Sequence, residues 1–257
     1  MLPKQIRIYR DKGTDPFCLK ALVSALQQEL VHQTYSITFA DRQLLQTATW
    51  HEHTKLLIFP GGRDIPYQEA LQGSGNQQIV DFVQQGGSFL GICAGAYYAS
   101  SHIEFEKGSP LEVIASRDLC FFPGCAVGPA YGPGTFGYQN QKGALIASLE
   151  LGSETSASYY HGGCAFIGEE NNPNISILAR YADLANKPPA IVRCTVGQGQ
   201  AVLCGVHPEY SAYHNHTSKH LPTPLFTALR KIEPERRLVF THLLRKLEVV
   251  HSHLTVN

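Results

Sequence analysis

Apolar runs alternate with amphipathic segments through the first hundred residues of this chain. Segment 17–30 repeats apolar residues every three or four positions, which predicts one buried face of a helix, and 76–87 predicts a second helix that ends in glycine. Short apolar runs that suit buried strands lie at 6–9, 35–39, 55–59 and 88–92. This alternation predicts a parallel sheet covered by helices.

The second half of the chain follows a different pattern. Strands are predicted at 175–181, 190–196 and 200–206, the last two joined as a hairpin across residues 197–199, and a terminal helix at 235–250. Residues 121–143 are rich in glycine, proline and aromatic residues, which predicts a loop over the site. We expect an α/β fold in one domain, 1–257: an open, mostly parallel, flavodoxin-like sheet with helices on both faces and an antiparallel extension.

Composition narrows the classes of partner. The 257 residues are 43% hydrophobic, enough for a sizeable core, and 21 basic residues balance 21 acidic ones. A formal net charge of zero gives no broad positive field, so we expect no nucleic-acid or membrane partner. No apolar run reaches 18 residues and the first ten residues lack a signal-like core, which favours a cytoplasmic protein. The seven scattered cysteines are expected to be reduced thiols.

Cys93 stands at the end of a predicted buried strand and before a predicted helix. Gly91-Ile92-Cys93-Ala94-Gly95 has the glycine-flanked form of a nucleophile elbow, a strand-turn-helix bend that exposes the central side chain. Unpaired N–H groups at the helix start would favour the thiolate. A buried structural cysteine beside two packing glycines is the alternative.

A base for this nucleophile is available in "GVHPEY", residues 205–210. Pro208 biases His207 toward an extended conformation, and Glu209 then projects to the same side as the imidazole. His207 would reach Cys93, and Glu209 would hold the ring and stabilise its charged form. By itself, the motif is also compatible with a strand-end turn that carries a surface carboxylate.

These residues resemble the class I glutamine amidotransferase superfamily. Within it, five motifs resemble the amidotransferase-like N-terminal domain of eukaryotic biotin-protein ligases, in matching order and over nearly the whole chain. The motifs are "FPGGRDIPY" (59–67), "GGSFLGICAGAYYAS" (86–100), "FFPG" (121–124), "YYHGG" (159–163) and "HPEY" (207–210).

The resemblance implies a role for each matching residue. Cys93 would be the nucleophile, His207 the base and Glu209 the third member of a triad. Main-chain N–H groups of Ala94 and of Gly61 or Gly62 would form the oxyanion hole. Glutamine-hydrolysing members usually carry Gln four residues after the nucleophile, whereas this chain carries Tyr97, which argues against glutamine as the substrate.

Weaker signals surround the triad. Arg63 and Asp64 could meet a substrate's carboxylate and amino group, or form a surface ion pair or helix cap. Tyr97 and Tyr160 are candidate pocket residues, although aromatic residues such as Tyr160 more often belong to a core. His214, His216 and His220 lack a completing cysteine or carboxylate motif, so no metal site is predicted.

Three functions remain compatible with the sequence. The first is a cysteine-dependent amidase or hydrolase that acts on a small-molecule amide or ester and needs no cofactor. The second is a non-catalytic ligand-binding or regulatory module, for which a protein partner is also conceivable. The third is a thiol redox protein, which needs Cys93 but not Glu209.

Overall fold

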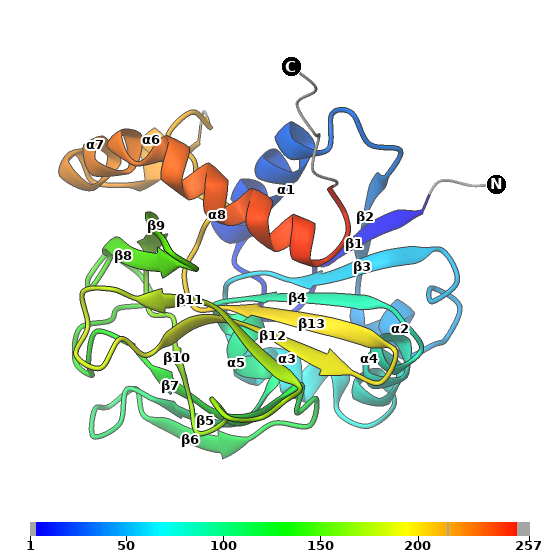
Figure 1. The fold of residues 1–257 in the computed structure, drawn as a ribbon. Helices are drawn as coiled ribbons and strands as arrows, with labels where there is room; N and C mark the ends of the chain where they lie inside the picture. The colour runs from blue at the N-terminus through cyan, green and yellow to red at the C-terminus, as the bar shows by residue number, and fades with distance from the viewer. Residues whose placement is uncertain (1–3, 215, 251–257) are drawn as a thin grey trace.

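A nine-stranded mixed sheet forms the centre of the molecule in the computed structural model, which describes residues 4–214 and 216–250 (Figure 1). Its strands run in the order β2 (Ser36–Ala40), β1 (Gln5–Tyr9), β3 (Thr54–Phe59), β4 (Ser88–Ile92), β13 (Gly199–Cys204), β12 (Pro189–Val196), β11 (Ile175–Tyr181), β8 (Leu145–Leu151) and β9 (Glu154–Tyr160). Strands β2 to β13 of this order pair in parallel, and the remaining pairs are antiparallel. The predicted mostly parallel sheet with an antiparallel extension is thus confirmed as a mixed α/β sheet.

Helices cover both faces of this sheet because its strands are apolar on both. In β3, Leu56 and Ile58 face one core and Leu57 and Phe59 face the other. The first core is covered by α1 (Pro16–Glu29) and α8 (Glu233–Lys246), the second by α2 (Arg42–Leu45), α3 (Asp64–Leu71), α4 (Ser74–Gln84) and α5 (Ala94–Tyr98) (Figure 1). Two further helices, α6 (Thr217–His220) and α7 (Thr223–Lys231), precede α8.

A second sheet of four strands extends the face that carries α5. Its order is β10 (Ala165–Ile167), β7 (Phe122–Gly128), β5 (Ser100–Phe105) and β6 (Val113–Ser116). The prediction that 121–143 is all loop is wrong in its first part, because residues 122–128 form the central strand β7. Phe122 and Ala126 of this strand are buried in the second core, and this burial outweighs the turn preference of its proline and glycines.

Residues 129–143 do form turns, and a buried carboxylate holds them against the second sheet. Glu106 is 1% exposed and accepts hydrogen bonds from the backbone N–H groups of Gly134 (2.6 Å) and Phe136 (3.2 Å). The ring of Phe136 packs on Phe105 and Tyr138. We call residues 129–143 the covering loop.

The register of the parallel strands determines where the site lies. Cys204 at the end of β13 pairs with Ile92 at the end of β4, so both chains leave the sheet at the same edge. Cys93 and the segment after residue 204 therefore emerge side by side, as ligand-binding residues do at the carboxyl edge of such sheets. Among the helices of the described residues, none is long and apolar enough to cross a membrane.

Candidate functional site

Cys93 occupies a sharp bend between β4 and α5. Its φ is +49° and its ψ is −102°, a conformation that side-chain-bearing residues rarely adopt. A Cβ on Gly91 would lie 2.5 Å from the carbonyl oxygen of Gly95, and one on Gly95 would lie 2.2 Å from that of Phe59. The bend thus requires both flanking glycines, and the Cys93 amide is fixed by donating to the Cys204 carbonyl at 2.8 Å.

His207 and Glu209 follow β13 and form a buried pair. The Nδ1–H of His207 donates to Oε1 of Glu209 over 2.8 Å, and the two residues are 3% and 0% exposed. The His207 amide also donates to the Tyr159 carbonyl at 2.7 Å, which anchors the segment to β9. With Nδ1 engaged by the carboxylate, Nε2 is the nitrogen left to exchange protons with other groups.

The charge on His207 depends on its two acidic neighbours. Burial would lower its pKa, but the negative charges of Glu209 and Cys93, with side-chain hydrogen bonds to both, raise the pKa well above its usual value. The imidazole is therefore protonated when both partners are ionised. A protonated imidazole in turn stabilises a thiolate beside it. The Cys93 sulfur also lies 3.7 Å from the His161 carbonyl oxygen.

Two hollows open beside the Cys93 sulfur. The main cavity has a volume of about 770 Å³, and Cys93, His207 and Arg63 are among the residues that line it. The second, which we call the recess, holds only about 20 Å³, room for one water-sized group. The recess is lined by Gly62, Asp64, Cys93, Ala94, Tyr97, Phe105, Phe136, Tyr138 and Gly162.

The two glycines proposed for the oxyanion hole face different neighbours. Gly62 lines the recess together with Ala94 and Cys93, and its φ of +151° suits glycine. A Cβ on Gly61 would instead lie 2.6 Å from the sulfur of Cys18 and 2.8 Å from Cε1 of His207. The oxyanion role of Gly61, Gly62 and Ala94 stays a prediction. Gly62 suits this role better than Gly61, because Gly62 borders the recess beside Cys93.

The four residues predicted to bind substrate lie in different surroundings. Arg63 is exposed at the main cavity, with its guanidinium 5.0 Å from the centre of the Tyr138 ring. Asp64 is paired with Arg117, whose Nε lies 2.9 Å from the carboxylate. Tyr97 is 4% exposed and donates its hydroxyl to the Gly162 carbonyl at 3.1 Å. Tyr160 packs in the first core, donates to the Gly163 carbonyl at 2.9 Å, and is absent from the described lining of both hollows.

Two further histidines, His220 and His161, line the main cavity. His220 stacks on Phe17 with ring centroids 3.5 Å apart and shares a hydrogen bond with Gln141. His161 borders the main cavity, and burial together with the charge of His207 lowers the pKa of His161 to about 4. It is therefore neutral at physiological pH.

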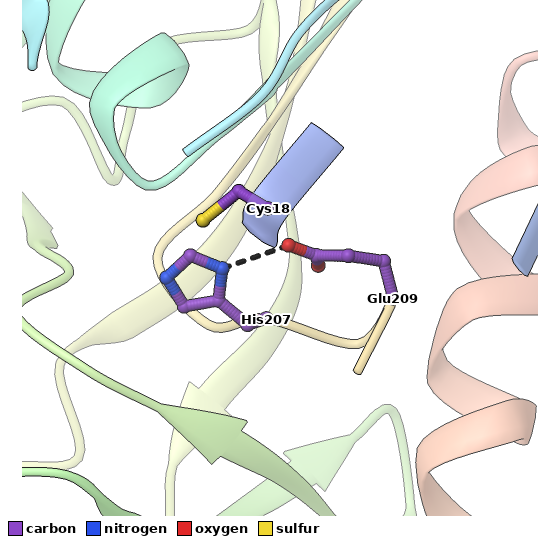
Figure 2. Close-up of side chains that lie close together, drawn as sticks. All are labelled: Cys18, His207 and Glu209. Carbon is purple, nitrogen blue, oxygen red and sulfur yellow. Dashed lines mark hydrogen bonds and ion pairs between the residues drawn. The ribbon is translucent and has the colours of Figure 1, made fainter. Parts of the chain in front are cut away.

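Sequence reasoning missed Cys18, which lies beside the pair of His207 and Glu209. Cys18 is in the first turn of α1, where Asp15 caps the helix by accepting from the amides of Phe17 and Cys18. Ligand atoms of Cys18, His207 and Glu209 all lie within 4.8 Å of one another (Figure 2). The Asp-Pro pair at 15–16 marks the helix start, but no local motif indicates that this helix reaches residue 207.

Known proteins share the sequence pattern and the fold of this chain. A family model described as "Biotin-protein ligase, N terminal" matches residues 4–256. An uncharacterized protein of Chlamydia muridarum is 39% identical over 210 residues, 80% of this chain and 81% of that protein. Among solved structures, PurLQS from Thermotoga maritima has a TM-score of 0.58 at 14% identity, over 95% of this chain and 99% of that one, a likeness of fold alone.

A characterised relative agrees with the family model. The biotin-protein ligase of Schizosaccharomyces pombe is 37% identical over 214 residues, which are 80% of this chain but only 33% of the ligase. The match therefore spans about a third of that protein. The family model, by contrast, covers residues 4–256, which is nearly all of this chain. This chain therefore belongs to the family of biotin-protein ligase N-terminal domains.

Proposed function

We propose that this chain is a ligand-binding, regulatory module that acts by holding a small molecule beside Cys93 rather than by consuming it. The observation that carries the proposal is the family match over residues 4–256. The matched relative is named as a ligase, and this chain covers only a third of it, so the shared part is a module of that protein. A protein partner that responds to the bound molecule is part of this proposal.

The main cavity supports a ligand of mixed character. Its volume of about 770 Å³ falls in the range of small-molecule sites. Lys12, Asp15, Arg63 and Glu69 supply charges of both signs, and Phe136 is among its apolar surfaces. We infer a small amide or ester that carries at least one charged group, with its carbonyl near the Cys93 sulfur.

The second candidate is a cysteine-dependent hydrolase of the same ligand class, which the 2.8 Å bond between His207 and Glu209 favours. In this reaction the Cys93 sulfur attacks the carbonyl carbon and His207 holds the thiol proton. The carbon–nitrogen or carbon–oxygen ester bond breaks as His207 returns that proton to the leaving group, and a thioester remains. Water then attacks the thioester with His207 as base and regenerates the thiol.

Residues around the triad would support these steps. Glu209 would keep the imidazole oriented and stabilise its positive charge. Amides at Gly62 and Ala94, which border the recess with Cys93, would stabilise the negative oxygen. The narrowness of the recess argues against a bulky group on this side of the carbonyl.

One experiment separates binding from turnover. Ligand-observed NMR with glutamine, biotin, biotin amide and small aliphatic amides and esters would follow both events in wild type, Cys93→Ser, His207→Ala and Glu209→Gln. The module proposal expects binding without product, with binding largely retained in Glu209→Gln. Product from wild type that disappears in all three folded variants would establish the hydrolase instead. Cys120→Ser is the matched control because Cys120 is exposed and lies outside both hollows.

A further inference from the structure

Cys18, His207 and Glu209 converge on one point below the main cavity. Each residue offers one ligand atom, and these atoms lie within 4.8 Å of one another (Figure 2). Gly61 allows the approach of the first two, since a Cβ there would lie 2.6 Å from the Cys18 sulfur and 2.8 Å from the His207 ring. The Tyr210 hydroxyl lies 3.5 Å from the same sulfur.

Glu209 has an oxygen that its surroundings leave unsatisfied. Oε1 accepts from His207, whereas Oε2 has no hydrogen-bond partner among the described residues. The residue is 0% exposed, so the main cavity does not hydrate this oxygen directly. A buried carboxylate that is only half satisfied is costly, and a cation bound to it would offset its negative charge.

We propose that Cys18, His207 and Glu209 form a binding site for a zinc-class divalent metal ion. One thiolate sulfur, one imidazole nitrogen and one carboxylate oxygen are the donor types that zinc takes in proteins. Zinc ligands stand about 2.0–2.3 Å from the ion, so donors less than 4.8 Å apart need only a small inward shift. On binding, the Cys18 thiol releases its proton to solvent and a sulfur–metal bond replaces the sulfur–hydrogen bond. The imidazole nitrogen that binds the ion likewise gives up its proton, to solvent or to the other ring nitrogen, and a nitrogen–metal bond replaces the nitrogen–hydrogen bond.

An ion could reach this site through the main cavity, and a molecule in the cavity could serve as its fourth ligand. Cys18 and His207 line the main cavity, whereas Glu209 lies behind them. Three protein ligands leave one position of a tetrahedral ion for water or a cavity-bound molecule, as in zinc sites that exchange ligands. The site therefore suits an exchangeable, regulatory ion better than a structural ion, which is usually enclosed by four protein ligands.

Metal binding would change the state of the triad. The ion draws on the same carboxylate and imidazole that share the 2.8 Å hydrogen bond, so their pairing loosens when metal is bound. His207 is then no longer held for proton exchange with Cys93. The site itself depends only on the donor geometry, and it stands whether the chain hydrolyses its ligand or only binds it.

Cobalt(II) and zinc(II) titrations of the full chain test the site. Cobalt added to wild type and to Cys93→Ser should produce thiolate-to-cobalt absorption, and Cys18→Ser should abolish it. By competition with a chromophoric chelator, Cys18→Ser should weaken zinc binding by more than about 100-fold, since even loss of an outer-shell partner costs about 10- to 100-fold. Cys164→Ser, which removes another buried thiol, is the matched control and should bind as wild type does.

A second measurement guards against misfolding of the Cys18 variant. X-ray absorption of zinc-loaded Cys93→Ser should show one sulfur near 2.3 Å together with nitrogen and oxygen ligands. Coordination by nitrogen and oxygen alone would overturn the proposal. So would thiolate–cobalt absorption that disappears in Cys93→Ser and persists in Cys18→Ser, because Cys93 and not Cys18 would then bind the ion.

Discussion

Two cysteines approach the same imidazole from differently built parts of the molecule. Cys93 stands in a bend with a φ of +49°, and its neighbours Gly91 and Gly95 leave no room for a Cβ. Cys18 stands in a regular 14-residue helix that begins at Pro16 and is capped by the Asp15 carboxylate. Both are 8% exposed, and burial raises the pKa of the Cys18 thiol well above its usual value. The two thiols are thus equally exposed but differ chemically. The strained bend directs the Cys93 sulfur toward the cavity, whereas burial in α1 keeps the Cys18 thiol protonated.

Alkylation rates give the largest expected contrast between the two thiols. Burial raises the pKa of the Cys18 thiol and so lowers its thiolate fraction at pH 7, and we therefore expect Cys18 to react more slowly than Cys93. Limited iodoacetamide treatment followed by mass-spectrometric mapping measures both rates in one sample. The exposed Cys120 serves as the internal reference. Equal rates at Cys18 and Cys93 would remove the contrast.

A methyl group at Gly61 should disrupt the packing between the Cys18 side chain and the His207 ring. Gly61→Ala places a Cβ within 2.8 Å of both the Cys18 sulfur and the His207 ring, and such overpacking should lower the free energy of unfolding by about 2–3 kcal/mol. Urea denaturation measures the change. Gly168→Ala is the control, because nothing lies within 4 Å of its Cβ and its φ of +104° alone should cost about 1 kcal/mol. A smaller loss at Gly61 than at Gly168 would contradict the predicted packing.

Alkaline pH should destabilise the protein partly through Cys18. Its pKa is raised by folding, so its contribution to stability is complete below the unfolded pKa near 9.0 and is lost as the pH rises toward the folded pKa. Above pH 9, Cys18→Ala should lose stability less steeply than wild type, by about 1.4 kcal/mol per pH unit. Urea midpoints at pH 7, 9 and 10 measure this slope. Burial also raises the pKa of Cys120, but less than that of Cys18, so Cys120→Ala should flatten the slope over a narrower pH range than Cys18→Ala does. Parallel slopes for Cys18→Ala and wild type would refute the assignment.

The smallest expected effects come from two tyrosine hydroxyls, one at the recess beside Cys93 and one in contact with Cys18. Tyr97→Phe removes a bond of 3.1 Å to the Gly162 carbonyl beside Cys93 and should cost about 1 kcal/mol. Tyr210→Phe removes a contact of 3.5 Å with the Cys18 sulfur, a weak partner, and should cost about 0.5 kcal/mol. Thermal unfolding of both variants in parallel measures the difference. The reverse order would mean that the Cys18 side is the more tightly bonded.

The parallel half of the large sheet could be predicted because burial on both faces makes its strands continuous apolar runs. Strand β4 matches its predicted range of 88–92, and β3 begins one residue before the predicted 55–59. The four-stranded second sheet was missed. Its strand β7 contains proline and two glycines, and it is a strand because the second core buries Phe122 and Ala126.

The residues of the candidate site also fall into two groups, those that local motifs indicate and those that only tertiary packing brings to the site. Cys93 and the pair of His207 and Glu209 could be proposed from short motifs, because a glycine-flanked bend and a proline-directed turn are encoded locally. Cys18 could not, since its position depends on how α1 docks beneath Gly61, some forty residues along the chain. The covering loop lies within the predicted loop of 121–143, but its anchoring could not be predicted, because the carboxylate of Glu106 that holds it lies outside that range.

The two hydrogen bonds to Glu106 oppose any opening of the covering loop, which contributes Phe136 and Tyr138 to the wall of the recess. Freeing Gly134 and Phe136 from this carboxylate forfeits bonds of about 1.5–3 kcal/mol each, or about 3–6 kcal/mol together. At about 1.4 kcal/mol per tenfold, the open form of the covering loop would then be present in about one molecule in 140 to one in 20,000. A ligand group too large for about 20 Å³ must wait for that minor form, so its association is slowed by the same factor. Residence in the recess becomes correspondingly long once the loop has closed again.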